Sequence, residues 1–394
     1  MKDVVIVDYL RTAQSRSRPQ DPARDWFHKI RADELLGQLL PELLKRTGVD
    51  KEEVDDFIVG SAMGVGEQWT WGGRTPLLLA NLSERTGSKF VGQQCGSGMA
   101  AIQIGFMEIA TGNADIVIAG GMEHLTRIPI GTTTANPKLS TEERYQHWNM
   151  ATSVHMGLIA EAMLKRSGLA RTDLDEWALR SHRLAAAAQQ RGFFEQEILP
   201  VEAEQADGSK LLVKHDQAVR ADTSLASLAA LKPAYQEGGA ITAGNASPLN
   251  AGATSMLLMA RETAMRKGIK PMAAIKAIAF AGVPPDLMGT GPVPASKKVL
   301  KAAGLAVADI DCWEINEAFA IVTLHCMRAL GIASDQVNVM GGGIALGHPL
   351  GASGIRLVGT LARILQETGG RYGLATACVG GGQGVATIIE REPR

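Results

Sequence analysis

The sequence predicts an α/β protein built from two related halves with an insert between them. Short apolar runs, of the length that buried strands have, alternate with segments whose apolar residues recur at the helical period. A helix, an apolar strand and a cluster of glycines follow one another in the first third of the chain and again in the last third. The alternation predicts the fold class, and the internal similarity predicts the duplication.

The first half contains the clearest elements. In chain order the predicted elements are a strand at residues 4–7, a helix from residue 32, a strand at 56–60, a helix from about residue 96 and a strand at 114–121. Pro41 lies inside the apolar pattern of the first helix, and we expect it to kink that helix.

The insert has a different pattern. A helical pattern runs from Ala151 to Arg191 and breaks near Gly168. Asp173 is placed to cap the second part, because its carboxylate can accept from free backbone amides. We expect the insert to cover one half as a loop domain. The predicted division is residues 1–121 with 251–270, then 122–250, then 271–394.

The last third repeats the pattern of the first. Residues 351–358 resemble residues 95–102, and each segment begins a helix that leads to an apolar strand and then to glycines. In the second copy the strand and its turn are residues 373–382.

Bulk composition limits the function classes. The formal net charge of −1 gives no overall field toward nucleic acid or anionic lipid. No window approaches the roughly 18 apolar residues that indicate a membrane span. The four cysteines form no Cys-x-x-Cys pair, so a zinc ribbon or a thioredoxin-type site is disfavoured and reduced thiols in the cytoplasm are expected.

Cys95 is the first candidate for chemistry. It precedes Gly96-Ser97-Gly98 and a predicted helix, whose positive end is expected to lower the pKa of the thiol. The glycines admit another molecule close to the backbone, whose amides can stabilise an oxyanion. Taken alone, a small buried cysteine at a tight junction is the alternative.

Three further residues lie on glycine-rich turns or at a strand end. His348 precedes Pro349 in a glycine-dense loop without the P-loop lysine, and it can accept a thiol proton or donate to an oxyanion. Cys378 ends a strand before three glycines and can move a proton to and from carbon. Asn316 follows a predicted strand, and its amide can bind an oxyanion or orient a water. Each alone also fits an ordinary structural role; together they suit a Claisen-type condensation.

With these motifs in hand, the chain resembles the thiolase family over essentially its whole length. The motifs that carry the resemblance are Cys95-Gly96-Ser97-Gly98, Asn316-Glu317-Ala318-Phe319, Gly347-His348-Pro349, Cys378-x-Gly380-Gly381-Gly382, His155-Met156-Gly157, Thr242-Ala243-Gly244-Asn245-Ala246-Ser247 and Met288-Gly289-Thr290-Gly291. The resemblance implies a five-layered αβαβα fold of two halves with an inserted loop domain.

The resemblance also implies an activity. It is the CoA-dependent cleavage of 3-ketoacyl-CoA, as in β-oxidation, or the reverse condensation, through an acyl thioester on Cys95. His348 would activate Cys95, and Cys378 would move the proton at carbon. Asn316, through a water, and His348 would stabilise the enolate, and the amides of Cys95 and Gly380 the tetrahedral oxyanion. The substrate- and CoA-binding residues implied are His155, Arg220, Ser247, Met288 and Phe319.

The implied reaction needs no metal and no permanently bound cofactor, since CoA is a substrate. The family forms homodimers or homotetramers, and a partner subunit of a β-oxidation complex is a further expectation.

Family members commonly have Asn three residues before the nucleophile, where this chain has Gly92, and residues 125–150 differ from the loop of the acetyl-specific tetrameric enzymes. Acyl-chain preference, direction and assembly state therefore stay open.

Two alternatives stay beside this interpretation. A ketosynthase-like condensing enzyme also uses a cysteine nucleophile, but it usually has two histidines as the partners. A non-catalytic CoA-binding subunit would not need Cys95, His348, Cys378 and Asn316 together.

Overall fold

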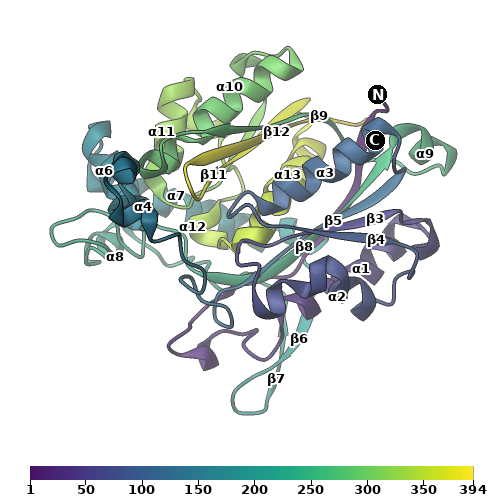
Figure 1. The fold of residues 1–394 in the computed structure, drawn as a ribbon, viewed down its shortest axis with the longest axis horizontal. Helices are drawn as coiled ribbons and strands as arrows, with labels where there is room; N and C mark the ends of the chain where they lie inside the picture. The colour runs from purple at the N-terminus through teal and green to yellow at the C-terminus, as the bar shows by residue number, and fades with distance from the viewer. Residues whose placement is uncertain (394) are drawn as a thin grey trace.

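One mixed β-sheet runs through the whole molecule (Figure 1). The computed structural model describes residues 1–393. The strands follow the order β10-β11-β12-β9-β1-β8-β5-β3-β4, and the short β2 pairs with β8. Their bounds are β1 (Val4–Arg11), β2 (Ser15–Arg16), β3 (Asp56–Gly60), β4 (Gly87–Val91), β5 (Ile116–His124), β8 (Asn250–Ala260), β9 (Ala273–Gly282), β10 (Cys312–Ile315), β11 (Tyr372–Val379) and β12 (Gln383–Arg391).

The sheet consists of two half-sheets that meet edge to edge. Strands β1 and β9 pair only where Val5 lies opposite Ala274 and Ile6 opposite Ala273. In the first half β3 pairs in parallel with β4 and β5, and β8 pairs antiparallel with β5 and β1. In the second half β10 and β11 are parallel, and β12 pairs antiparallel with β11 and β9. The same sequence of pairings in both halves fits the internal similarity of the chain.

The longer helices of the two halves form three layers around these half-sheets. α1 (Ala32–Thr47) and α2 (Thr70–Leu79) cover the first half, and α10 (Pro292–Ala303), with α11 (Ala320–Leu330) beside it, covers the second. α3 (Ser97–Thr111) and α13 (Leu350–Thr368) lie between, and α13 packs against strands of both halves. The predicted five-layered αβαβα fold is confirmed.

Neighbouring glycines of β5 show why the middle layer is tight. Successive strand residues face opposite sides of a sheet. A Cβ on Gly120 would meet Leu36 of α1 at 3.1 Å, whereas one on Gly121 would meet the carbonyl oxygen of Gly351 in α13 at 2.5 Å. Only glycine at 121 lets the backbone of α13 approach the strand this closely.

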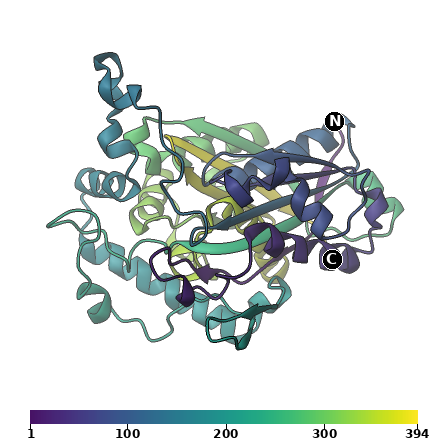
Figure 2. The same ribbon diagram turned by 60° about the horizontal axis from the view of Figure 1, so that its bottom comes forward.

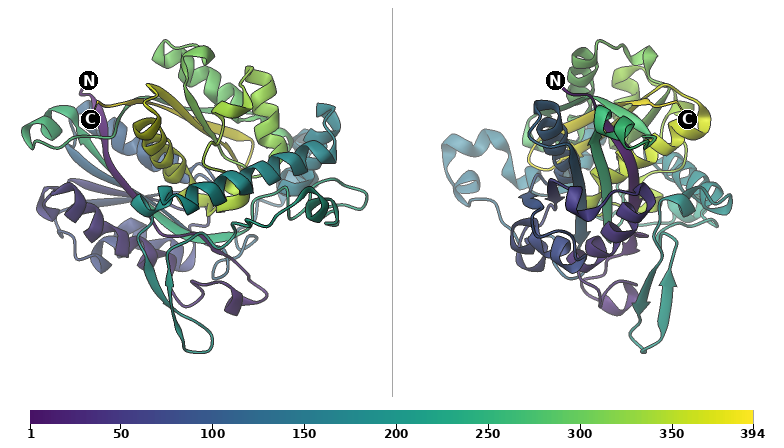
Figure 3. Two further views of the ribbon diagram at one scale, coloured as in Figure 1. Left: turned by 180° about the vertical axis from the view of Figure 1, so that it is seen from behind. Right: turned by 90° about the vertical axis from the view of Figure 1, so that its right-hand side faces the viewer.

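The regular structure of the insert between β5 and β8 is mainly helical. Its elements are α4 (Lys138–Thr141), α5 (Met150–Ser153), α6 (Met156–Ser167), α7 (Arg171–Gln190), β6 (Val201–Glu204), β7 (Lys210–Val213) and α8 (Leu225–Ala229). Figure 2 shows the stretch after β5, which carries α4, projecting from the body, and Figure 3 shows the long α7 lying across the molecule. The two remaining short helices are α9 (Arg261–Arg266) and α12 (Gly343–Leu346).

Eight 3-10 turns connect these elements within residues 1–393. They are η1 (Pro22–Arg24), η2 (Lys51–Glu53), η3 (Gly66–Gln68), η4 (Glu143–Trp148), η5 (Phe193–Gln196), η6 (Pro285–Thr290), η7 (Val307–Asp309) and η8 (Ser334–Gln336).

Local predictions mostly agree with these bounds. The helical pattern breaks at Gly168, where φ is 68°, and the Asp173 carboxylate accepts from the backbone amide of Ala170 at 2.6 Å, as a cap. Pro41 was expected to kink α1, and in the structure a single helix continues through it from Ala32 to Thr47. A proline inside a helix costs about 3 kcal/mol. Buried leucines on both sides of it, each contributing about 1.5–3 kcal/mol, outweigh that cost.

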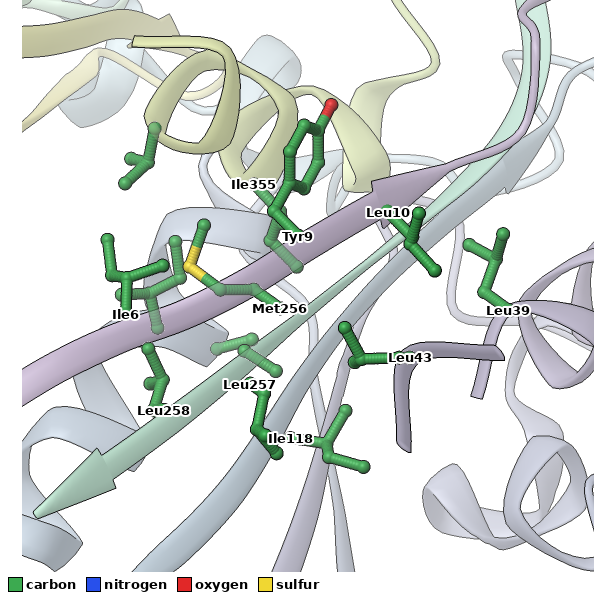
Figure 4. Packing of buried hydrophobic residues seen from close by; sticks show 14 of the residues in the cluster. Ile6, Tyr9, Leu10, Leu39, Leu43, Ile118, Met256, Leu257, Leu258 and Ile355 are labelled. Atoms are coloured by element: carbon green, nitrogen blue, oxygen red, sulfur yellow. The ribbon is translucent and has the colours of Figure 1, made fainter. Parts of the chain in front are cut away.

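The main hydrophobic core lies on both faces of the first half-sheet (Figure 4). Tyr9 and Ile355 fill the side toward α13, and Leu39 and Leu43 fill the side toward α1. This core holds β1, β8 and α13 rigidly, and α13 begins at the loop that carries His348. Within residues 1–393 no helix has the length and apolar character needed to cross a membrane.

Candidate active site

Cys95 lies on a tight turn between β4 and α3. Gln94 adopts the left-handed conformation with φ 48°, which L-residues other than glycine and asparagine rarely adopt. The Ser97 hydroxyl holds this turn: it donates to the carbonyl oxygen of Gln94 at 2.7 Å and accepts from the amide of Gln93 at 2.8 Å. Cys95 itself is half-buried, at the N-terminal side of α3.

The Cys95 turn packs against the loop that follows Cys378. A Cβ on Gly96 would come within 2.9 Å of Val379, and one on Gly380 would come within 3.0 Å of Gln94. The Gln93 side chain donates to Gln383 at 3.1 Å, and the backbone amide of Gly380 hydrogen-bonds the Cys95 sulfur. The two cysteine loops, far apart in sequence, are therefore neighbours.

The same turn meets the start of α13. A Cβ on Gly98 would lie 2.7 Å from the carbonyl oxygen of Gly351, and one on Gly354 would lie 2.5 Å from the amide of Met99. The two segments that resemble each other in sequence thus touch at their helix N-termini. Because α13 begins two residues after His348, this contact brings the histidine loop to the Cys95 turn.

His348 is fixed by hydrogen bonds on both ring nitrogens. Its Nδ1 lies 2.6 Å from the Ser353 hydroxyl, which donates its own proton to the carbonyl oxygen of Pro349 at 2.9 Å. The hydroxyl must therefore accept from Nδ1–H, which leaves the lone pair on Nε2. Nε2 lies 3.2 Å from the side-chain nitrogen of Asn316 and accepts from it. Burial, with the charge of Arg356, lowers the pKa of His348 to about 3, so the ring is neutral.

Asn316 follows β10, and its neighbour holds the histidine loop. Glu317 accepts from the amide of Ile344 at 3.1 Å and from the indole of Trp177 at 2.8 Å. Oδ1 of Asn316 is buried and makes no hydrogen bond to any described residue. That atom is therefore a buried acceptor that can take a hydrogen bond from a water.

One prediction about Cys95 is wrong. The helix N-terminus was expected to lower the pKa of its thiol, but burial and the charge of Glu123 raise the pKa to about 11, against the opposing effect of the Gly380 amide. The loss of water therefore outweighs the hydrogen bond from the Gly380 amide. Burial also raises the pKa of Cys378, and the nearby Cys95 adds to the shift. Both thiols are protonated at rest.

Three residues of this site were missed from the sequence. Glu123 is fully buried near the end of β5 and accepts from the amides of Ala62 at 2.8 Å and Gly351 at 2.9 Å, so it ties α13 to the end of β3. Asn250 accepts from the amide of His348 at 2.8 Å. Ser353 orients the imidazole. Of the three, only Ser353 could have been identified from the sequence, because it matches Ser97 in the duplicated segment.

Four of the five predicted substrate-binding residues lie on connected elements. Ser247 donates from its amide to the carbonyl oxygen of Ala318, next to Phe319. The Phe319 ring packs edge-on against Tyr235 at 5.9 Å, and Tyr235 lies over Gly157, two residues after His155. η6, which carries the buried Met288, packs against α6 and α11.

Arg220 is the fifth, and it lies on the segment after β7. Its backbone amide donates to Nδ1 of His182, at 3.2 Å, and its side chain is exposed. No hydrogen bond of the described residues joins the Arg220 side chain to the other four residues.

Comparison with known proteins agrees with this geometry. Residues 4–262 match the family model described as thiolase, N-terminal domain, and residues 269–391 match thiolase, C-terminal domain. The chain is 40% identical to a 3-ketoacyl-CoA thiolase of Marinobacter nauticus and 42% identical to one of Acinetobacter baylyi, each over 99% of this chain and 98% of the relative.

Solved structures give the same result. Human mitochondrial 3-ketoacyl-CoA thiolase superposes with a TM-score of 0.87 at 31% identity. Acetyl-CoA acetyltransferase of Bacillus anthracis superposes with a TM-score of 0.87 at 35% identity. Each alignment covers 99% of both chains. On this fold, this site and these matches, the chain belongs to the thiolase family of acyl-CoA C-acyltransferases.

Proposed function

We propose that this chain cleaves 3-ketoacyl-CoA with CoA, and runs the reverse Claisen condensation, through an acyl thioester on Cys95. The observation that carries the proposal is the packing of the Cys95 turn on both the Cys378 loop and the start of α13. The packing supports a role for both thiols and the neutral imidazole of His348, and we propose that Nε2 takes the Cys95 proton once the Asn316 side-chain nitrogen releases it.

The first half-reaction breaks the carbon–carbon bond. The Cys95 sulfur attacks the keto carbon while its proton passes to Nε2 of His348. Thiolate and imidazolium form as a pair, because burial disfavours either charge alone. The tetrahedral adduct collapses, the bond between C2 and C3 breaks, and the electron pair goes to the enolate of acetyl-CoA. The Cys378 thiol gives its proton to C2, and acetyl-CoA leaves.

The second half-reaction releases the shortened acyl group. The Cys378 thiolate takes the proton of an incoming CoA thiol, and the CoA sulfur attacks the thioester carbonyl. Cys95 leaves as a thiolate and recovers its proton from the His348 imidazolium. Every group returns to its starting state, so the same residues serve the reverse direction.

The Gly380 amide is suited to change partners during this cycle. At rest it hydrogen-bonds the Cys95 sulfur. Acylation replaces the Cys95 thiol by a thioester sulfur, which is a weak acceptor, and it brings a carbonyl oxygen, a stronger acceptor, to which the amide can turn. We propose that it then forms the oxyanion site together with the amide of Cys95. Asn316 and His348 would stabilise the enolate oxygen.

The insert supplies the substrate side of the proposed site. We propose that residues 122–250 act as the loop domain and that His155, Arg220 and Ser247 contact CoA, with Met288 and Phe319 beside the acyl group. The contacts of Tyr235 with Phe319 and Gly157 support this placement, because they join the insert to the loop after Asn316.

Thiolysis of acetoacetyl-CoA by the purified protein tests the function. Acetoacetyl-CoA with free CoA should give two acetyl-CoA per substrate consumed, measured by chromatography. A panel of longer and branched 3-ketoacyl-CoA substrates then ranks acyl chains by kcat/KM. If every substrate is bound but none is cleaved, the chain is a non-catalytic CoA-binding subunit and the proposal fails.

The assembly proposed is a homodimer. β4 is an edge strand, hydrogen-bonded to β3 on one side only, and the adjoining α2 exposes Trp71 and Leu79 at 70% and 55%. An uncovered apolar edge promotes aggregation, so a second copy is its expected cover. Light scattering coupled to gel filtration at micromolar concentration should give twice 41.8 kDa. A single-chain mass would contradict the dimer, and four copies or a co-purifying β-oxidation subunit would extend it.

All four cysteines are unpaired in the structure. Catalysis by two of them needs a reducing compartment, and we propose the cytoplasm.

A further inference from the structure

Four arginines gather around the side chain of Gln217. Its carbonyl oxygen accepts from the amide of Arg16 at 2.7 Å, and its nitrogen donates to the carbonyl oxygen of Arg24 at 2.9 Å. Arg18 lies two residues after Arg16, and Arg220 lies three residues after Gln217. One glutamine thus joins a loop near the N-terminus to the segment after β7. We call Arg16, Arg18, Arg24 and Arg220 the arginine cluster.

A buried carboxylate fixes the N-terminal segment that carries Arg16, Arg18 and Arg24. The buried Asp25 carboxylate accepts from the hydroxyls of Ser15 and Thr126 and from the amide of Phe27 at 3.0 Å. Thr126 in turn accepts from the amide of Arg18 at 2.8 Å. The backbone positions of Arg16 and Arg18 are therefore fixed before any ligand binds.

Acidic side chains neutralise little of the positive charge of the arginine cluster. The guanidinium groups of Arg16, Arg18 and Arg220 make no hydrogen bond or ion pair with any described residue, and Arg24 has only the exposed Asp21 at 3.8 Å. Arg16 and Arg18 are half-buried. Burial, and then the charges of Arg18, Arg220 and Arg24, lower the pKa of Arg16 to about 10, so it stays charged at neutral pH. Half-buried like charges held together favour a bound polyanion.

The cluster is coupled to the catalytic loop. The side chain of Asn250 donates to the carbonyl oxygen of Ser15 at 2.9 Å and accepts from the amide of His348 at 2.8 Å. Arg16 is the next residue along β2, which pairs with β8 at Asn250. A single side chain therefore connects the strand that presents Arg16 to the proposed catalytic histidine.

We propose that Arg16 and Arg18, together with Arg220, bind the phosphate groups of the nucleotide end of CoA. The inference rests on the proposed function, which makes CoA the substrate, and it assigns Arg16 and Arg18 to that substrate for the first time. Guanidinium groups pair with phosphate oxygens through two parallel hydrogen bonds, and several can share one 3′-phosphate and one pyrophosphate. Phosphate binding by these arginines does not require a glycine-rich loop.

Acceptor thiols of different length test this assignment. Thiolysis of one 3-ketoacyl-CoA is measured with CoA, dephospho-CoA and pantetheine for wild type, R16Q, R18Q and R85Q. Arg85 is a matched control, because it is exposed, forms no ion pair with any residue that the structure describes and lies before β4 at the end away from Cys95. The ratio of kcat/KM with CoA to kcat/KM with pantetheine should fall about tenfold in R16Q and in R18Q, which corresponds to about 1.4 kcal/mol for one phosphate contact. R85Q should match wild type.

Direct binding separates failure of this inference from failure of the function. Adenosine 3′,5′-bisphosphate is titrated into each variant by calorimetry, and circular dichroism verifies the fold. Weaker binding in R16Q and R18Q than in wild type supports the arginine cluster even if no thiolysis is detected, and that outcome overturns only the proposed function. An active wild type whose R16Q and R18Q variants keep the wild-type ratio and affinity overturns the phosphate site alone.

Discussion

The side-chain nitrogen of Asn316 lies 3.2 Å from Nε2 of His348. One group comes from the loop after β10 and the other from the loop before α13, so the contact joins two elements that are separate in sequence. It makes the amide and the imidazole one unit, with Oδ1 of Asn316 left as a buried acceptor. The first prediction concerns this unit.

Asn316→Ala should lower kcat about 10²–10³-fold, as the loss of one oxyanion donor does in other enzymes. Acylation of Cys95 should survive, because Asn316 is assigned to the enolate and not to the nucleophile. Steady-state condensation of acetyl-CoA and intact mass of the acyl-enzyme measure the two steps. Equal loss of both would contradict the division of roles.

Ser353→Ala should reduce kcat about 10–100-fold with little change in KM, because Nδ1–H of His348 loses its acceptor and the ring loses its orientation. Ser255→Ala is the matched control, since Ser255 is also fully buried but its hydroxyl makes no hydrogen bond within residues 1–393. An equal fall in both variants would indicate a packing effect. Ser353 would then not position the imidazole.

Replacing each of the two cysteines by alanine should block a different step of the reaction. Cys95→Ala should abolish both turnover and the acyl adduct seen by intact mass after incubation with acetyl-CoA. Cys378→Ala should still acquire the adduct but not condense it, because the sulfur that removes the proton at carbon is missing. Condensation by Cys378→Ala at more than about 1% of the wild-type rate would refute its role.

The free enzyme should react with iodoacetamide slowly at neutral pH. Burial and Glu123 raise the pKa of Cys95 to about 11, and only the thiolate is the nucleophile. The inactivation rate should rise about tenfold per pH unit from 7 to 10, without a plateau. Peptide mapping must show that Cys95 is the modified residue. A plateau below pH 8 would mean that the helix N-terminus does dominate.

Stability should depend on pH through His182. Burial, with the charges of Arg220 and Arg16, lowers the pKa of His182 to about 4, below its ordinary 6.5. The unfolded chain therefore binds more protons between pH 4 and 6.5, and folding free energy is lost as the pH falls through that window.

For His182 alone the loss reaches about 2–3 kcal/mol at pH 4. Urea unfolding of wild type and His182→Asn between pH 4 and 7.5 measures it. The variant should be less stable at pH 7.5, because the hydrogen bond from the Arg220 amide is altered, but its stability should change less with pH. Parallel curves would assign the pH dependence to other groups.

The sequence by itself determined most of the elements and the family, and it predicted the residues that carry the chemistry. Residues 56–60 were predicted as a strand from an apolar run alone, and β3 has those bounds. Cys95, His348, Cys378 and Asn316 were found because glycine-rich turns and strand ends carry local signals that survive without a structure. Such signals depend on residues that are close along the chain.

Tertiary structure decided everything that depends on distant residues. Pro41 does not break α1, because leucines packed against the sheet outweigh one missing hydrogen bond. The pKa of Cys95 rises because the surrounding protein replaces water and because the charge of Glu123 disfavours the thiolate. No local sequence pattern records either effect. Glu123, Asn250 and Gln217 act by joining loops tens to hundreds of residues apart. Their roles exist only once the folded sheet brings those loops together.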